Sequence, residues 1–105
     1  MAEMPAKKQK CIANYENVKK YIDSLPTDEQ SDALYVLNHL EEGEFQKVLC
    51  KTWRKGIKEV YFKRNNRIYY VEQGKTIYLL YACRKQKNKT TKKDADIIIK
   101  RAKEL

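Results

Sequence analysis

The spacing of apolar residues changes at Gly43, and this change limits the possible folds more than any other feature of the sequence. Before Gly43, apolar side chains recur every three or four residues, which predicts two amphipathic helices. After it, the period shortens to two and β-branched and aromatic residues become frequent, which predicts strands. The pattern therefore indicates an α+β fold in which an N-terminal helical hairpin packs on an antiparallel sheet.

The hairpin is expected to begin with a helix over residues 14–24 that ends before Pro26. Its apolar stripe is predicted to comprise Tyr15, Val18, Ile22 and Leu25. A capping box, in which Thr27 and Gln30 exchange hydrogen bonds, should open the second helix, and Gly43 should end it. Its buried face is predicted to comprise Ala33, Leu34, Leu37 and Leu40. Because the turn between them is short, the two helices should pack as an antiparallel pair.

Three strands, at residues 57–63, 67–72 and 76–83, are predicted to form an antiparallel meander. Asn65 and Asn66 tolerate the left-handed conformation that a tight hairpin between the first two strands requires. The third strand is apolar on both faces, which is typical of a strand enclosed between two layers. The meander is therefore expected to form the centre of the domain.

The ends of the chain add a few further expectations. A last helix should begin after Thr91, whose hydroxyl can cap it. Its buried stripe is predicted to comprise Ala95, Ile98, Ile99, Ala102 and Leu105. An edge strand around residues 10–13 would bring the sheet from three strands to four. We expect one domain over residues 1–105, with residues 1–10 as a weakly ordered leader.

Positive charge is concentrated in the second part of the chain. Residues 1–46 hold 5 Lys and Arg against 9 Asp and Glu, whereas residues 47–105 hold 18 against 5. A field of this sign attracts nucleic acid, an anionic membrane surface or an acidic protein. The charge alone leaves these three partners open.

Other features narrow the location and the chemistry. No apolar run approaches the roughly 18 residues that span a bilayer, and no signal peptide is evident, so we expect neither membrane insertion nor export. Cys11, Cys50 and Cys83 are odd in number and widely spaced, which favours the reducing cytoplasm over a disulfide framework or a zinc site. His39 has no partners at ligand spacing in the sequence. We expect no metal and no small-molecule cofactor.

Basic and aromatic residues alternate along the predicted strands. Alternate residues of a strand share a face, so cations and rings can meet there. Such a surface suits single-stranded RNA, since cations neutralise phosphates while rings stack on bases. The alternative is that the lysines only solvate the sheet and that Tyr69 or Tyr81 belongs to the core. Trp53, beside Arg54 and Lys55, leaves the same two possibilities open: a base-stacking ring or part of the core.

Four motifs in the second part of the chain occur in an order similar to that of a known family. They are Glu59-Val60-Tyr61, Arg67-Ile68-Tyr69-Tyr70, Leu79-Leu80-Tyr81-Ala82 and Lys85-Gln86-Lys87-Asn88-Lys89-Thr90. They resemble, in that order, the Glu-Leu-Arg, Arg-x-x-Tyr, Leu-Leu-His-Gly and Lys-Lys-x-Gln-Lys-Thr segments of the RelE/ParE toxin superfamily. The resemblance is greatest to its HigB-like, phage-derived branch, and it implies a RelE-like fold.

This resemblance implies the toxin of a type II toxin–antitoxin system. Such a toxin is a ribosome-dependent mRNA endoribonuclease that inhibits translation, needs no metal, and is silenced by a cognate antitoxin. In the HigB-like branch the antitoxin resembles a helix-turn-helix repressor, here a HigA-like one. We expect its acidic segment or helix to mask the basic face.

The resemblance also implies roles for individual residues. Arg67 is a candidate for stabilising transition-state charge, Lys85 for clamping phosphate, and Glu59 for acting as a base or orienting group. Tyr81 occupies the place of the family's His, although a tyrosine with its ordinary pKa near 10 would need a strong shift to act as a base. Candidate RNA-binding residues are Tyr61, Lys63, Arg64, Tyr69, Arg84, Lys87 and Lys89.

The sequence departs from the family pattern at three positions, and two other functions remain open. Tyr61 stands where Arg is usual, Gln86 replaces Lys, and Thr91 replaces Pro.

One alternative is a ParE-like inhibitor of DNA gyrase, which shares the fold. The other is an RNA-binding domain without catalysis.

Overall fold

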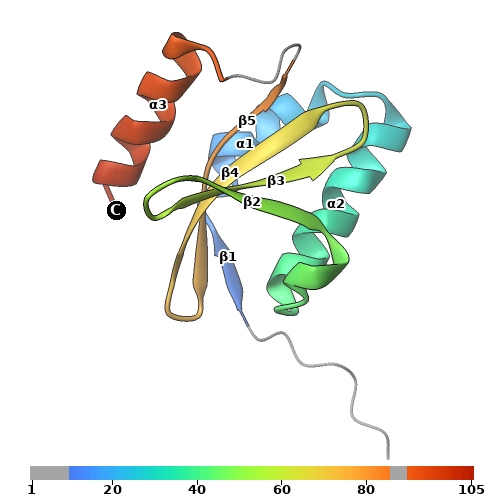
Figure 1. Cartoon of the computed structure of the whole chain (residues 1–105). Coiled ribbons are helices and arrows are strands. Elements are labelled where there is room, and N and C mark those ends of the chain that lie inside the picture. The colour runs from blue at the N-terminus through green and yellow to red at the C-terminus, as the bar shows by residue number, and fades with distance from the viewer. Residues whose placement is uncertain (1–9, 86–89) are drawn as a thin grey trace, which may run out of the picture.

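The computed structural model describes residues 10–85 and 90–105, which form three α-helices, a short 3₁₀ helix and a five-stranded sheet (Figure 1). The helices are α1 (Glu16–Asp23), α2 (Thr27–Glu41) and α3 (Lys92–Lys103), with the 3₁₀ turn at Phe45–Lys47. The strands are β1 (Cys11–Ala13), β2 (Leu49–Arg54), β3 (Ile57–Phe62), β4 (Asn66–Gln73) and β5 (Thr76–Arg84). The predicted α+β class is confirmed.

The sheet differs in detail from the expected three- to four-stranded antiparallel meander. Its order is β1-β5-β4-β3-β2, so five strands are present in the part of the chain that the structure describes. β2 to β5 are antiparallel in sequence order, whereas β1 pairs with β5 in parallel, with Cys11 opposite Thr76. After β1 the chain passes through α1 and α2 to the opposite edge of the sheet, where β2 lies. It then returns strand by strand to β5, which lies beside β1 and runs parallel to it. The edge strand near residues 10–13 was therefore placed correctly, but its direction was not foreseen.

Strand β2 was missed because it lies at the edge of the sheet. Its residues are largely exposed, and Leu49 is 57% exposed, so its apolar alternation is weak. A tight turn connects β2 to β3, with Gly56 at a φ of 80°. That positive φ is costly for any residue with a Cβ atom, so a glycine at this position is the sequence signal for the hairpin.

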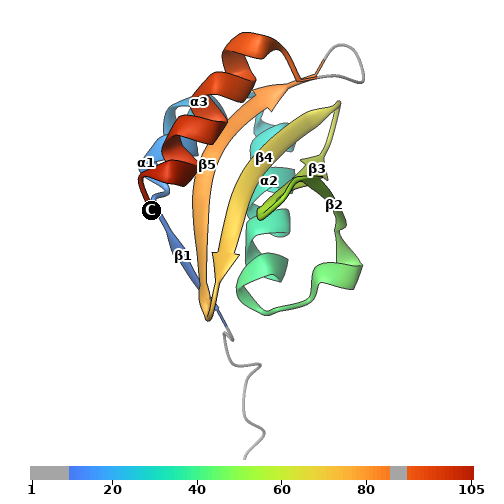
Figure 2. The same cartoon turned by 60° about the vertical axis from the view of Figure 1, so that its left-hand side comes forward.

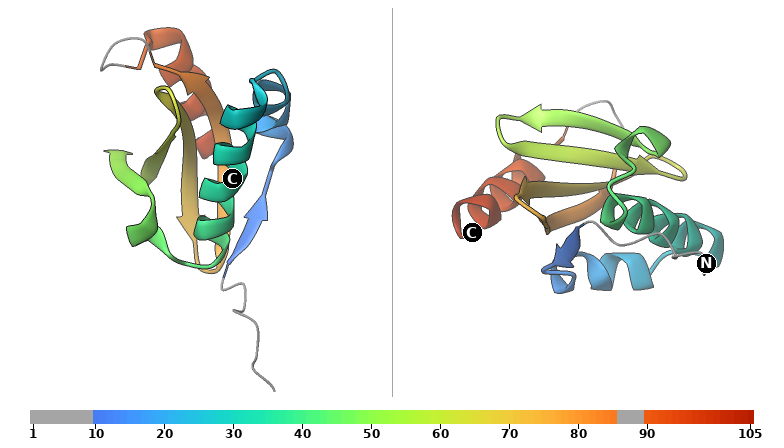
Figure 3. Two further views of the ribbon diagram at one scale, coloured as in Figure 1. Left: turned by 90° about the vertical axis from the view of Figure 1, so that its right-hand side faces the viewer. Right: turned by 90° about the horizontal axis from the view of Figure 1, so that it is seen from below.

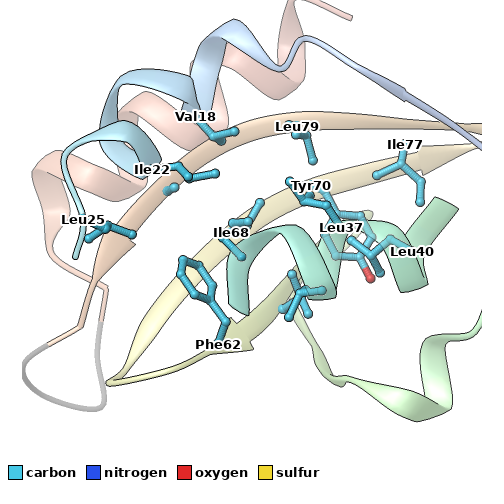
Figure 4. Close-up of a cluster of buried hydrophobic side chains, with 14 residues drawn as sticks. Val18, Ile22, Leu25, Leu37, Leu40, Phe62, Ile68, Tyr70, Ile77 and Leu79 are labelled. Carbon is cyan, nitrogen blue, oxygen red and sulfur yellow. The ribbon is translucent and has the colours of Figure 1, made fainter. Parts of the chain in front are cut away.

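Helices cover both faces of the sheet (Figures 2 and 3). α1 lies against β5 and α2 against β3 on one face, while α3 packs on β5 from the other face. The expected helical hairpin is present, but α1 and α2 pack chiefly on the sheet rather than on each other. Figure 4 shows the core between these two helices and the sheet. Its fully buried side chains include Val18, Leu40, Ile68, Tyr70, Ile77 and Leu79.

The predicted boundaries of α2 hold, but two local expectations are wrong. The capping box does not form: the Gln30 side chain instead donates to the carbonyl of Leu25, at 2.8 Å, in the turn before the helix. Leu34 is 57% exposed, because the stripe that begins at Ala33 continues through Val36, Leu37 and Leu40. Gly43, at a φ of 72°, ends the helix as expected.

The C-terminal helix follows its prediction closely. The Thr91 hydroxyl accepts a hydrogen bond from the amide of Asp94 at 3.2 Å, and Ile98 is fully buried against the sheet. Leu105 lies beyond the helix end and is 42% exposed, so its predicted burial is wrong. Across residues 10–85 and 90–105, none of the helices combines the length and apolar character needed to cross a membrane.

Candidate functional site

A buried carboxylate lies on β3, on the sheet face that α3 partly covers. Glu59 is 4% exposed, and its Oε1 atom accepts hydrogen bonds from the Tyr61 hydroxyl at 2.8 Å and from the Arg67 guanidinium at 3.3 Å. Its Oε2 atom lies 3.9 Å from the Lys85 ammonium. Arg67 and Lys85 are themselves 5% and 8% exposed. The structure therefore brings together three of the four predicted catalytic residues, with Tyr61 beside them.

Strand register explains this convergence of residues that are distant in the sequence. Tyr61 pairs with Arg67 and Glu59 pairs with Tyr69, so Glu59 and Arg67 are diagonal neighbours on one face. Lys85 follows β5, and its amide donates to the carbonyl of Asn65 at 2.9 Å. This bond holds Lys85 against the end of the β3–β4 hairpin, within reach of Glu59.

An open pocket of about 410 Å³ lies over this cluster. It is lined by Lys51, Thr52, Trp53, Arg54, Glu59, Tyr61, Lys85 and Thr90. Lys51 pairs directly with Glu59 across β2 and β3, and its ammonium lies 5.1 Å from the centre of the Tyr61 ring. The Arg67 guanidinium carbon lies 4.0 Å from the same ring. A substrate that entered the pocket would meet cations grouped around one carboxylate.

The charges of the cluster do not balance. One carboxylate, Glu59, faces the cations of Arg67, Lys85 and Lys51. Within the described residues, the buried Glu59 Oε2 and Arg67 Nε atoms have no hydrogen-bond partner. Burial, aided by repulsion from Arg67 and Lys51, lowers the pKa of Lys85 despite the attraction of Glu59. A cluster with excess positive charge around one carboxylate is suited to attract an anion such as a phosphodiester.

Two aromatic residues, Tyr69 and Trp53, pack together on the same side of the sheet as Glu59. Tyr69 is fully buried, its hydroxyl lies 2.8 Å from that of Thr90, and burial raises its pKa. The Trp53 ring meets Tyr69 edge to face at 5.3 Å, and the Arg54 guanidinium lies over Trp53 at 4.6 Å. Tyr69 therefore belongs to the core in this structure, whereas Trp53 lines the pocket wall.

Tyr81 faces α3 rather than the pocket. Its hydroxyl donates to Asp94 at 2.7 Å, and Arg101 lies over its ring at 5.8 Å. Burial, with the hydrogen bond to Asp94, raises the pKa of Tyr81 to about 12. A base at this position would need a downward shift, so the environment of Tyr81 opposes the role that its place in the motif implied.

A second cationic group, of Lys63, Arg64 and Arg84, lies near the start of α2. Arg64 pairs with Asp28 at 2.7 Å, Lys63 with Asp28 at 3.6 Å, and Arg84 with the buried Glu29. These three candidate RNA-binding residues therefore share two acidic partners, Asp28 and Glu29, whereas Arg67 and Lys85 share the single carboxylate of Glu59. The candidates Lys87 and Lys89 lie outside the described residues.

Sequence reasoning missed several pocket residues, most importantly Lys51, and also Thr52 and Thr90. Lys51 was overlooked because β2 was not recognised. The alternation after Leu49 and the Lys55-Gly56 turn were the available signals.

The fold brings one further set of metal-ligand types together. The ligand atoms of His39, Glu42 and Glu44 lie within 4.8 Å of one another. Glu44 already pairs with His39 at 3.0 Å and with Lys47 at 2.9 Å. These ion pairs explain why His39 and Glu44 lie close together without a metal ion.

Comparison with known families gives a match over most of the chain. The family model described as Phage derived protein Gp49-like (DUF891) matches residues 20–103. The chain belongs to this family. The match begins within α1 and includes α2, the β2–β5 meander and α3, so every residue of the pocket lies inside it. The Gp49-like family is associated with RelE-like and toxin-like proteins. No curated protein matches the chain.

Proposed function

We propose that this Gp49-like protein is the toxin of a type II toxin–antitoxin system and cleaves translated mRNA on the ribosome. The observation that carries the proposal is the buried Glu59 carboxylate, which is paired with Arg67 and lines an open pocket together with Lys85 and Lys51. Family membership supports the toxin class. The resemblance to the RelE/ParE superfamily implies the reaction class, an attack by the RNA 2′-hydroxyl on the adjacent phosphate, and a carboxylate beside several cations is compatible with it.

In this mechanism Glu59 acts as the general base. It takes the proton of the 2′-hydroxyl as that oxygen bonds to phosphorus, and the bond from phosphorus to the 5′-oxygen breaks. Lys85 donates a proton to the departing 5′-oxygen, a step that its lowered pKa favours. The products are a 2′,3′-cyclic phosphate and a 5′-hydroxyl. All proton transfers are assigned to side chains of this chain.

Arg67 and Lys51 have an electrostatic role in the proposal. As phosphorus becomes five-coordinate, charge develops on its equatorial oxygens, and preorganised cations in a buried site stabilise it. Arg67 is fixed by Glu59 and by the Tyr61 ring, so it needs little reorganisation. Lys51 is exposed on the outer strand and is suited to contact an adjacent phosphate.

The proposed partners are mRNA in the ribosome and a cognate antitoxin of the HigA-like, helix-turn-helix type. Masking of the pocket cations by an acidic segment of the antitoxin would silence the toxin in the cytoplasm. The excess of positive charge around Glu59 supports both partners, because each presents negative charge.

Controlled expression tests the proposal. The wild-type protein is expected to arrest growth and to produce cuts in translated mRNA, mapped by primer extension. Arg67→Ala and Lys85→Ala should relieve both effects, while Lys19→Ala, which removes an exposed cation on α1, should not. If both pocket variants remain fully toxic, the assigned site is wrong. Loss of gyrase supercoiling with intact mRNA would support the ParE-like function instead.

A further inference from the structure

Tyr61 stands at the position where the similar toxins usually carry an arginine, yet it contacts three charged groups of the site, those of Glu59, Arg67 and Lys51. It lies two residues after Glu59 on β3, so both side chains project from the same face of the sheet. Its hydroxyl donates to Glu59 Oε1 at 2.8 Å. Its ring lies against the Arg67 guanidinium at 4.0 Å and the Lys51 ammonium at 5.1 Å.

These contacts leave the two carboxylate oxygens of Glu59 unequal. Oε1 accepts from both Tyr61 and Arg67, whereas Oε2 has no hydrogen-bond partner among the described residues. The nearest cation recorded for Oε2, the Lys85 ammonium, lies 3.9 Å away, beyond hydrogen-bond distance. One oxygen is anchored, whereas the other is shielded from solvent in this structure and has no hydrogen-bond donor among the described residues.

A tyrosine achieves this asymmetry in a way that an arginine would not. A guanidinium tends to bind both oxygens of a carboxylate in a fork, which would leave neither oxygen free to accept a proton. A phenol donates one hydrogen bond and therefore engages one oxygen. Its ring also attracts the neighbouring cations, which holds Arg67 beside Oε1.

We propose that Tyr61 is a positioning residue that anchors Glu59 through Oε1 and so keeps Oε2 free to accept the 2′-hydroxyl proton. This inference rests on the proposed function, since it requires Glu59 to act as a base. Tyr61 itself exchanges no proton with the substrate in this scheme. Its contribution should appear in the rate of cleavage and not in RNA affinity.

The test compares Tyr61→Phe with the wild-type protein. Phenylalanine keeps the ring and both cation contacts but removes the hydroxyl. We expect kcat for cleavage of ribosome-bound mRNA to fall by about 10- to 100-fold, a part of what general-base catalysis contributes. The Kd for a 2′-O-methyl RNA oligonucleotide, which lacks the nucleophile, should stay within about twofold, because the cations remain in place.

Two further variants make the test specific. Tyr70→Phe removes a hydroxyl from the neighbouring strand on the opposite face, where it contacts Cys50, and should leave kcat unchanged. Tyr61→Leu removes the ring as well, so it should lower kcat and raise the Kd for RNA. Thermal unfolding of each variant verifies that the fold is intact.

The outcomes separate this inference from the function on which it rests. If the wild-type protein cleaves mRNA and Tyr61→Phe keeps its kcat, the positioning role is wrong while the proposed function stands. A loss of RNA affinity at unchanged kcat would make Tyr61 a binding residue and would also overturn the inference. Absence of cleavage by the wild-type protein would overturn both.

Discussion

At the scale of single residues, the most informative position is Glu59, because its negative charge has opposite effects on catalysis and on binding. As a base it should accelerate cleavage, but as an anion it should repel the phosphate that the surrounding cations attract. Glu59 and Arg67 are both almost fully buried, so their pair also contributes to folding. One substitution can measure all three effects.

We predict that Glu59→Gln lowers the cleavage rate by at least about 100-fold, since the general base is lost. RNA affinity should stay constant or increase, because the remaining cations of the pocket no longer face a carboxylate. The free energy of unfolding should fall by about 3–5 kcal/mol, the usual cost of leaving a buried charge without its partner. Single-turnover cleavage, filter binding and urea unfolding measure the three quantities. Cleavage at the wild-type rate would exclude Glu59 as the base.

A second residue-scale prediction concerns Glu29, which is 2% exposed under the β3–β4 hairpin. The hydrogen bond from Asn66, followed by the charges of Arg84 and Arg64, holds the pKa of Glu29 below its ordinary value of 4.5. A carboxyl whose pKa is lowered by folding stabilises the protein above its ordinary pKa, and this stabilisation is lost as pH falls through the folded value. Glu29→Gln should therefore lower the urea midpoint at pH 7, and the difference should shrink below about pH 4.5. A difference that stays constant down to about pH 3 would contradict this.

At the scale of elements, secondary structure is predicted best from the sequence where one face of a segment is buried and the opposite face has its own uniform environment, because the apolar period is then clear. β3, β4 and β5 were found because their apolar residues face the core, and α3 because the Thr91 cap and the buried Ile98 lie at helical spacing. β2 escaped because an edge strand has few buried side chains to mark its period. The exposure of Leu34 could not be predicted, because it depends on which face of α2 packs against the sheet, and that is decided by tertiary structure.

The same reasoning explains what could be predicted of the site. Arg67, Lys85 and Glu59 were selected by resemblance, and they do converge. Their geometry could not be predicted, since it depends on the register of β3 against β4 and on the Lys85–Asn65 bond. Tyr81 could not be assigned from its motif position, because the contact with Asp94 on α3 decides its environment.

A prediction at this scale concerns the attachment of α3. Ile98 is fully buried and joins Tyr69, Val71 and Leu80 of the sheet, whereas Ile99 is only partly buried. Ile98→Ala should lower the free energy of unfolding by about 2–5 kcal/mol, through lost burial and the cavity that remains. Ile99→Ala removes the same atoms from a wetter position and should cost about half as much or less. Urea unfolding of both variants measures the difference, and equal losses would mean that Ile98 does not anchor the helix.

At the scale of the whole molecule, the cations that the sequence concentrates after residue 46 fall into two groups with different acidic partners. Lys63, Arg64 and Arg84 pair with acids of α2, so part of that charge is balanced within the fold. The cations around Glu59 outnumber their single carboxylate. The field that reaches an approaching polyanion should therefore be strongest over the pocket, on the side of the sheet opposite α1 and α2.

The salt dependence of RNA binding tests this division with two lysines of matched charge. Each phosphate contact that a cation makes with single-stranded RNA contributes about 0.7 to the slope of log affinity against log salt concentration. Lys51→Gln, in the pocket, should lower the magnitude of this slope by about that amount. Lys63→Gln should change it little, because Lys63 already pairs with Asp28 at 3.6 Å. Filter binding of a single-stranded RNA from about 50 to 200 mM salt gives both slopes. If Lys63→Gln produces the larger change, RNA follows the end of the β3–β4 hairpin near α2, and the pocket over Glu59 is not its main contact.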